Sequence, residues 1–392
     1  MDKYIEGYSS YGRMLRYYNI LSTEAASPEK ITAAIEYTQR LNNIGAFAKL
    51  KEVLSSQLAL DEPQWKKETA SKLFDTVKEL EGRISAVYVD DEKAELLFEL
   101  SDIHESHGEY AKAVKNCLGA IENIKNSTLL AKGYYRLIRL NIFLENFHQA
   151  NTFLEKLKSL NDSVKAFYTA FINFMSFFMA IRSTENFVNA FNLLDSVTTF
   201  EEKDKWQFSE FLSFEDVAIF GTLIGLLTQK HKVNVENLVN NSKFRNQANT
   251  VPELVVLLED YKQNKFANIC NDVRQLEKYM KYNLYFGQNI GSVIATVRSK
   301  CYIEYIFAYS VVDMNLMAKM FGDSLITVEN SLEEFINAGT IKAKIDSITH
   351  TLIFVQGDER YNAYNAAVEA VTKAIQLSQE IVLKSDAMLD FI

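Results

Sequence analysis

The chain has 392 residues, of which 48% are hydrophobic and only three are proline, and its formal net charge is −9 at pH 7. This length is enough for two or three domains with a large core, and scarce proline is typical of a mostly helical protein. The negative charge argues against nucleic acids and anionic membranes as main partners, because both would repel it.

The N-terminal part of the chain predicts a series of helices. Residues 2–23 are rich in tyrosine and are expected to be helical. Ser27 and Pro28 form a helix start, with a capping hydroxyl followed by proline at the first helical position. Helices are then expected over residues 28–41, 46–58 and 63–85. Since Asp2 follows Met1 and no apolar run comes next, we expect no targeting segment.

A helical repeat begins at Ala94. Each unit is an apolar helix, a short polar break, an aromatic residue and a second helix with alanine at a close-contact position. Seven positions recur at a constant offset of 37: Leu97/Tyr134, Leu100/Leu137, Ile103/Leu140, Tyr110/Phe147, Ala113/Ala150, Cys117/Leu154 and Ala120/Leu157. Residues 186–194 look like a third copy. The pattern resembles tetratricopeptide repeats, so we expect a stack of helical hairpins with a curved surface for partners.

Residues 166–181 form the most apolar run of the chain. Asn173 interrupts it, and Lys165 and Arg182 flank it. Because the run is short for a bilayer span, we expect a helix buried between neighbouring helices.

Residues 213–297 are predicted to be a linking helical region. Ser213 and Asp216 form a capping box at the start of an apolar helix. Gly221 and Gly225 lie four residues apart on one face of that helix, which predicts close packing against another helix.

Residues 298–356 predict a winged helix. Helices are expected over residues 298–309, 313–321 and 324–338, and strands over residues 341–345 and 351–355. Asp313 and Ser324 can cap the second and third helices, which Gly322 and Gly339 end. In the second helix, Leu316, Met317, Met320 and Phe321 are expected to share one apolar face.

The charge of this stretch argues against reading DNA. It carries five basic and seven acidic residues, and its third helix carries Glu329, Glu333 and Glu334 without any lysine or arginine. Phosphate contacts supply most of the affinity of a DNA-binding protein, so an acidic helix would be repelled from the groove. We therefore expect this winged helix to face protein.

A narrow apolar seam follows the wing. The positions, at alternating spacings of three and four, are Tyr361, Tyr364, Val368, Val371, Ile375, Ser378 and Val382. The seam could pack back on the chain or join helices of other subunits. A stripe of two positions in seven is narrower than the face of a globular core helix, which favours a bundle with partners.

The sequence contains no recognisable catalytic constellation. His104 and His107 are three residues apart, whereas the histidines of the metalloprotease helix motif are four apart, so a solvated turn is expected there. Phosphate-binding and dinucleotide-binding loops and the Gly-x-Ser-x-Gly motif are missing from the sequence. Cys117, Cys270 and Cys301 lie in apolar helical patterns and are expected to be buried thiols of a cytoplasmic or nuclear protein. We therefore expect a protein that is not an enzyme, without cofactor or metal.

Helical repeats, a winged helix and a trailing helix together resemble the PCI family of scaffold subunits. Members occur in the proteasome lid, the COP-nine signalosome and a translation initiation factor. Residues 212–221, and Arg13 through Tyr18 near the start, resemble the signalosome branch, which they favour. Residues 313–321 and 341–346 resemble a winged-helix core that the signalosome and proteasome-lid branches share. Residues 317–322 and 335–339 look at least as much like the proteasome-lid branch, which is the alternative. A nucleic-acid-associated member of the initiation or export type is a second alternative.

The resemblance implies a fold, a function and a set of contacts. The implied organisation is mostly α: repeats over residues 1–212, a PCI domain over 213–357 with a helical part (213–297) and a winged helix (298–357), and a C-terminal bundle helix and tail over 358–392. In the family, winged helices join edge to edge into a ring and C-terminal helices form a shared bundle. The implied interface residues are Ile341, Ala343, Ile345, Leu352, Phe354, Tyr361, Tyr364, Val368, Val371, Ile375 and Val382.

The implied function is a non-catalytic scaffold of the signalosome, which removes a ubiquitin-like modifier from the cullins of ubiquitin ligases. The metal chemistry belongs to another subunit. The implied partners are other PCI subunits and the metalloprotease subunit pair, with cullin–RING ligases as indirect partners. Neither nucleic acid nor membrane is expected.

Overall fold

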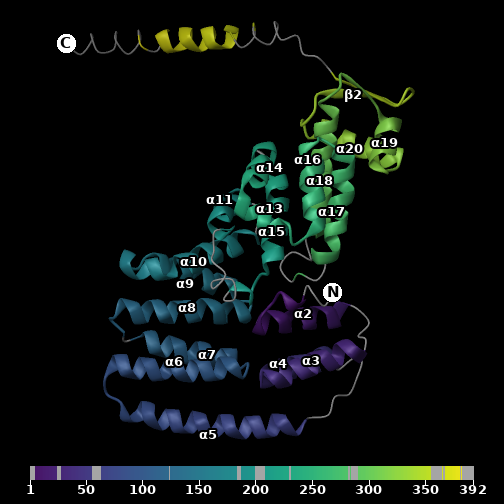
Figure 1. Ribbon diagram of the computed structural model, residues 1–392. Helices are drawn as coiled ribbons and strands as arrows, with labels where there is room; N and C mark the ends of the chain where they lie inside the picture. The colour runs from purple at the N-terminus through teal and green to yellow at the C-terminus, as the bar shows by residue number, and fades with distance from the viewer. Residues whose placement is uncertain are drawn as a thin grey trace, which may run out of the picture. The chain divides into compact units, whose positions relative to one another are not determined.

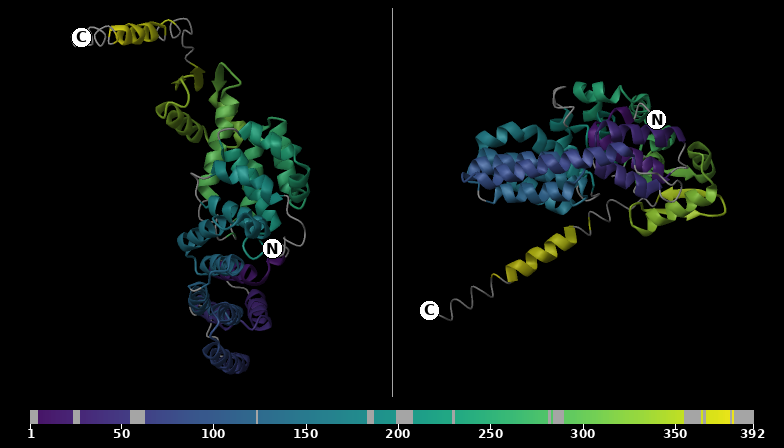
Figure 2. Two further views of the ribbon diagram at one scale, coloured as in Figure 1. Left: turned by 90° about the vertical axis from the view of Figure 1, so that its left-hand side faces the viewer. Right: turned by 90° about the horizontal axis from the view of Figure 1, so that it is seen from below.

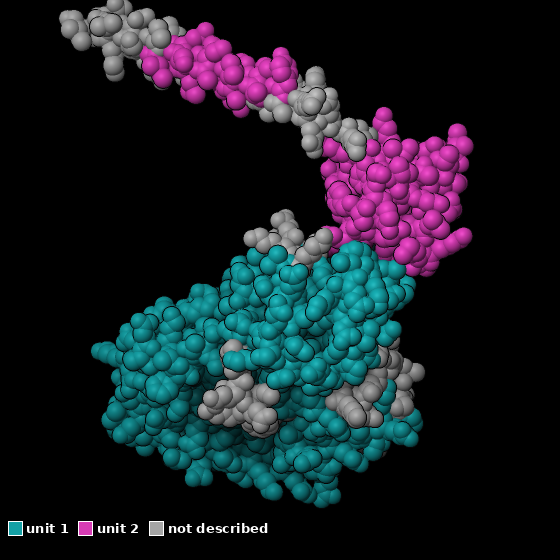
Figure 3. Space-filling view, turned by 45° about the horizontal axis from the view of Figure 1, so that its top comes forward, with its two compact units in different colours: residues 1–298 teal, residues 299–392 magenta. Residues whose placement is uncertain are grey.

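The computed structural model describes residues 5–23, 28–54, 63–122, 124–182, 187–198, 208–228, 231–280, 283, 290–354, 364, 367–379 and 381. The chain divides into two compact units, residues 1–298 and residues 299–392, which are coloured separately in Figure 3. The described secondary structure is mainly helical with one small sheet. The predicted fold class, a mostly α protein with helical repeats and a winged helix, is therefore confirmed.

Unit 1 is built from helices, which are labelled in Figure 1. In chain order they are α2 (Ser10–Thr23), α3 (Pro28–Arg40), α4 (Ile44–Leu54), α5 (Gln64–Ala86), α6 (Asp90–Ser106), α7 (Tyr110–Ile121), α8 (Ser127–Phe143), α9 (Phe147–Lys158), α10 (Asp162–Ala180), α11 (Phe187–Thr198), α13 (Phe214–Leu227), α14 (His231–Asn240), α15 (Ser242–Ala248), α16 (Pro252–Lys262) and α17 (Phe266–Met280). Helix α18 (Ile290–Ile306) spans the boundary between the units.

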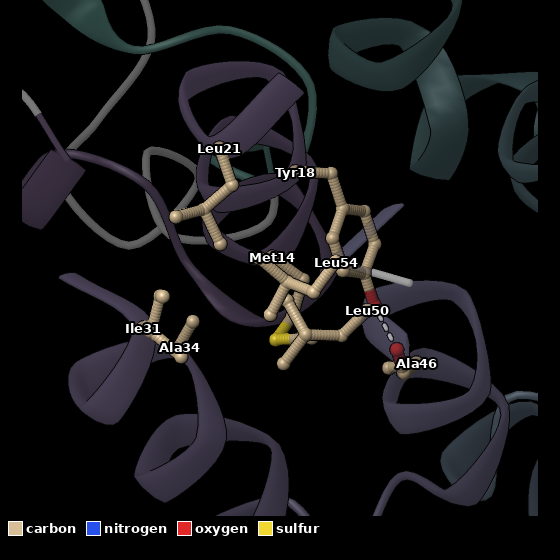
Figure 4. Packing of buried hydrophobic residues seen from close by; sticks show 8 residues of the cluster. All are labelled: Met14, Tyr18, Leu21, Ile31, Ala34, Ala46, Leu50 and Leu54. Atoms are coloured by element: carbon tan, nitrogen blue, oxygen red, sulfur yellow. Dashed lines mark hydrogen bonds between the residues drawn. The ribbon is translucent and has the colours of Figure 1, made fainter. Parts of the chain in front are cut away.

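Helices α2, α3 and α4 share an apolar cluster, which Figure 4 shows at close range. On α2, Met14, Tyr18 and Leu21 are spaced four and three residues apart, so their side chains lie on one face of the helix. The Tyr18 hydroxyl donates a hydrogen bond to the carbonyl oxygen of Ala46 on α4. This bond satisfies the polar end of a side chain whose ring is buried.

The predicted repeats are present as the helix pairs α6/α7, α8/α9 and α10/α11, and successive pairs pack on one another. Figure 2 shows these layers from two further sides. Ala113, Ala150 and Ala190 are fully buried, as expected of close-contact positions. Gly108 ends the first turn with φ of 81°, a left-handed conformation that glycine adopts without steric cost.

Two details of the repeats differ from the prediction. His104 is not in a solvated turn: it is buried, and its Nδ1 lies 2.7 Å from Oε2 of Glu109. The carboxylate gives the His104 ring a polar partner, which offsets the cost of burying the ring. In α10, the predicted buried helix, Phe171, Phe174 and Phe178 are buried as expected, but Phe167 is 88% exposed. In the described part of the chain, no helix is both long and apolar enough to cross a bilayer.

The predicted capping box and the glycine pair of α13 are both confirmed. The Ser213 side chain accepts from the Asp216 N–H, and the Asp216 side chain accepts from the Ser213 N–H. A Cβ atom on Gly221 would lie 2.7 Å from a methyl carbon of Leu194, and one on Gly225 would lie 3.1 Å from a methyl carbon of Leu238. Small residues at these positions therefore allow the neighbouring helices to pack closely.

Asp216 also holds the N-terminal segment against α13. Its Oδ2 atom accepts hydrogen bonds from the Tyr8 hydroxyl and from Nδ2 of Asn283, the latter over 3.2 Å. The fully buried Arg16 interacts electrostatically with this carboxylate, and its guanidinium group donates a hydrogen bond of 2.9 Å to the carbonyl oxygen of Phe211. Residues far apart in the chain thus share one buried polar network.

Unit 2 contains the predicted winged helix. After α18 come β1 (Val311–Asp313), α19 (Met314–Phe321), α20 (Leu325–Asn337), β2 (Ala343–Asp346) and β3 (Thr351–Phe354). Asp313 caps α19, Ser324 caps α20, and Gly322 ends α19 with φ of 67°. The strand β1 falls where the sequence analysis expected a connection between helices.

The apolar face of α19 is narrower than predicted. Met317 and Phe321 are buried, whereas Leu316 is 56% and Met320 is 53% exposed. The prediction of one shared face was wrong for these two residues. Tyr302 and Tyr305 pack against the Phe321 ring at centroid distances of 4.7 and 5.6 Å, whereas Met320 is contacted at its sulfur by the Tyr305 hydroxyl.

Candidate interaction surfaces

The small sheet of unit 2 presents two outer strands. Its strand order is β1-β3-β2, and both neighbours run antiparallel to β3. Since β3 is the central strand, its main chain is paired on both sides. Within the described residues, the edges that a further strand could join are therefore β1 and β2.

The wing residues predicted to form an interface lie mostly inside the unit. Leu352 is fully buried, Ile341 is 2% exposed and Ala343 is 7% exposed. Ile345 and Phe354 are half-buried. Through β2, a partner could therefore meet main-chain groups and the half-buried side chains, but not the three buried ones.

The opposite face of the sheet carries an exposed row across all three strands. Val311 on β1 and Lys344 on β2 are both register partners of Ile353 on β3. Val311 is 52% and Ile353 is 44% exposed. We call these three residues the outer row. The apolar run 351–355 does not by itself single out Ile353, but strand alternation places its side chain on the opposite face from Leu352.

The tip of the wing is a tight polar turn. The Asp346 side chain accepts hydrogen bonds from the Ile348 N–H at 2.9 Å and the Thr349 N–H at 3.3 Å. Hydrogen bonding by the Thr349 side chain and by these two N–H groups holds the pKa of Asp346 below its usual range. The same turn leaves Ile348 93% exposed, so the tip offers an apolar contact.

Helix α20 has an acidic surface. Glu333 and Glu334 are exposed, and Glu329 lies 2.9 Å from the ring of His350, the residue before β3. In a DNA-binding winged helix this face would meet phosphates, and here it would be repelled. The arrangement is suited to a protein partner.

The described part of the C-terminal segment is helical over residues 367–379, and every described residue from 364 to 381 is exposed. The predicted seam residues Tyr364, Val368, Val371 and Ile375 are 66%, 45%, 58% and 53% exposed. The seam residues Tyr361 and Val382 lie outside the described residues. The described seam is therefore an apolar stripe accessible to solvent within this chain.

The fold agrees with the comparisons with known proteins. Residues 273–356 match the family model of the PCI domain, and residues 62–233 match the model of 26S proteasome subunit RPN7. Residues 273–356 thus form a PCI domain.

Proteins of two kinds are similar in sequence to parts of this chain. COP9 signalosome complex subunit 1 of Arabidopsis thaliana is 25% identical over 46% of this chain and 40% of its own length. COP9 signalosome complex subunit 1b of Drosophila melanogaster is 21% identical over 74% of this chain and 55% of its own length. The 26S proteasome non-ATPase regulatory subunit 6 of Dictyostelium discoideum is 23% identical over 60% of each chain. The chain thus spans about half the length of the relatives it matches.

The PCI match covers the whole described sheet and helices α19 and α20, together with α18 and most of α17. The outer row and the acidic face of α20 are therefore surfaces of the PCI domain. The C-terminal seam follows this domain in the chain.

Proposed function

We propose that this PCI protein is a non-catalytic scaffold subunit of a COP9-signalosome-type complex. In this proposal the PCI sheet adds to the sheets of other PCI subunits through β1 or β2, and the C-terminal helix joins a shared helical bundle. The partners are other PCI subunits and a metalloprotease subunit pair, and cullin–RING ligases are bound indirectly. The complex would act in the cytoplasm and the nucleus.

The observation that carries the proposal is the exposed seam of the C-terminal helix. An isolated helix of this length is marginal in water, and its stability usually comes from packing an apolar face. Val368, Val371 and Ile375 form such a face, yet each is about half exposed in this chain. Helices from other subunits would cover this apolar face, because apolar residues at two positions in seven typically pack against a partner helix.

The relatives support two candidates for the kind of complex. Several of them are named as subunit 1 of the COP9 signalosome, which supports that assignment. The match to the RPN7 model and to proteasome regulatory subunit 6 supports a second candidate, a subunit of the proteasome regulatory lid. Both candidates use the same scaffold surfaces.

A tagged full-length chain, expressed at near-endogenous level and recovered with its partners, tests the proposal. Mass spectrometry should identify other PCI subunits with a metalloprotease subunit and cullins. Proteasome ATPases and proteolytic core subunits would instead assign the chain to the lid. Recovery of the chain alone would contradict both candidates.

A matched pair of variants tests the seam. Ile375→Asp should release the chain from its complex, because it places a carboxylate in the seam. Leu377→Asp is the control: Leu377 is 59% exposed and lies on the opposite side of the same helix. Circular dichroism should show that both variants remain folded. If Ile375→Asp unfolds the isolated chain, the seam packs internally and the bundle proposal is wrong.

A further inference from the structure

Unit 1 contains an open cavity that is lined mainly by helices of the repeats. Its volume is about 820 Å³, and its lining comes mainly from α6, α8 and α10, the first helices of the three repeat pairs. Helix α8 contributes Lys132, Tyr135, Arg136, Arg139 and Phe143. These residues are spaced three, one, three and four apart, so they form one face of the helix. The cavity thus lies against the first helices of the three repeat pairs.

The charges of the cavity are balanced in number. Three carboxylates, from Asp102, Glu105 and Glu210, face three cations, from Lys132, Arg136 and Arg139. A polyphosphate or another polyanion would meet the carboxylates, and a polycation would meet the guanidinium groups. The balance therefore favours a ligand that carries both signs of charge.

The buried part of the cavity contains more carboxylates than cations. Arg139 lies 2.9 Å from carboxylate oxygens of both Glu105 and Glu210, and the side chains of all three residues are less than a fifth exposed. One cation is thus shared by two buried carboxylates. Burial raises the pKa of Glu105, Arg139 beside it acts in the opposite direction, and the neighbouring Glu210 carboxylate raises it further.

The outer part of the cavity is positive. Arg136 donates two hydrogen bonds to Asp102, at 2.7 and 2.6 Å, and this pair is neutral. Lys132, one turn earlier on α8, is exposed, and among the described residues it has no ion-pair partner. A ligand carboxylate at this position would gain a charge partner without breaking an existing ion pair.

An aromatic wall connects the two parts. The Tyr135 ring lies 4.5 Å from the Phe171 ring and 5.9 Å from the Tyr168 ring, measured between centroids. Phe167 lines the same cavity and is 88% exposed, although α10 is otherwise the most apolar helix of the repeats. Aromatic faces of this kind bind both apolar side chains and cationic ones.

We propose that this cavity binds an extended peptide segment of a partner protein that carries a basic, an acidic and an apolar side chain. The basic side chain reaches Glu105 and Glu210, the acidic side chain pairs with Lys132, and the apolar side chain packs on Phe167. The inference concerns unit 1 alone and does not depend on which complex the chain joins.

Fluorescence polarisation of the full-length chain with short labelled peptides tests this proposal. The peptides share an alanine and glycine framework with one phenylalanine, and they carry either one lysine and one glutamate, two lysines, or two glutamates. We expect the mixed peptide to bind at least about tenfold more tightly than the other two, which corresponds to about 1.4 kcal/mol. Tighter binding of either single-sign peptide, or no binding of the mixed peptide, would overturn the proposal.

Two surface variants separate binding from folding. Lys132→Glu should weaken binding of the mixed peptide about tenfold and shift the preference toward the peptide with two lysines. Lys115→Glu is its control, since Lys115 is exposed on α7 and does not line the cavity. Phe167→Ala should weaken binding of the mixed peptide, while Phe74→Ala, at a 67% exposed position on α5, should not. Unchanged affinity in both Lys132→Glu and Phe167→Ala would also refute the proposed site.

Discussion

Replacing Asp216 should loosen the N-terminal segment from the body of unit 1. In Asp216→Ala, the Tyr8 hydroxyl, the Ser213 N–H and the Asn283 amide lose the oxygen that accepts their hydrogen bonds. Each buried donor left without an acceptor costs about 1–3 kcal/mol, and an uncompensated buried charge on Arg16 adds to this. The carboxylate's own burial penalty disappears at the same time, so we expect a net loss of about 3–5 kcal/mol in the free energy of unfolding.

Asp216→Asn separates the acceptor from the charge. The asparagine oxygen can still accept from the three donors, so we expect a loss of only about 1–2 kcal/mol. Urea unfolding followed by circular dichroism measures both variants, and hydrogen exchange by mass spectrometry reports on α2 directly. We expect faster exchange in α2 for the alanine variant. If Asp216→Ala unfolds at the wild-type urea concentration with unchanged exchange in α2, the network does not hold this segment.

Three further predictions concern pH, packing and DNA. Burial raises the pKa of Asp216, so the native state binds the proton more tightly than the unfolded state does. The free energy of unfolding of the wild type should therefore increase relative to that of Asp216→Asn as the pH falls toward about 4. A pH-independent difference in urea unfolding would contradict this. A Cβ atom on Gly12 would lie 2.2 Å from the Glu210 carbonyl oxygen, whereas the space around Gly82 in α5 is open. In thermal unfolding, Gly12→Ala should therefore lose about 1–3 kcal/mol and Gly82→Ala should gain about 0.5–1 kcal/mol, and equal shifts would refute the packing argument. Fluorescence anisotropy should detect no nanomolar binding of duplex DNA by the unmodified protein, and nanomolar affinity would refute the reading of α20 as a protein-facing helix.

The local elements of this protein follow from its sequence. Spacing and capping residues were sufficient to predict α13, α19 and α20, because Ser213, Asp313 and Ser324 act on N–H groups only two or three residues away. The first helix of the winged helix was predicted from residue 298, but α18 begins eight residues earlier, at Ile290. The recurrence of Ala113 at Ala150 likewise predicted the close packing of the repeats, since a repeated pattern implies a repeated contact. Each of these signals lies within one or two helices.

Other features depended on residues far apart in the chain, and only the tertiary structure decided them. Strand β1 forms because β3 pairs with it, and the local sequence pattern does not predict a strand of three residues. The burial of Asp216 depends on Tyr8 and Asn283, which its capping pattern does not reveal. The cavity described above also depends on the contact between Arg139 and Glu210, which are 71 residues apart in the chain. Short-range spacing determines which residues become helical, whereas long-range packing determines which of their side chains stay exposed for a partner.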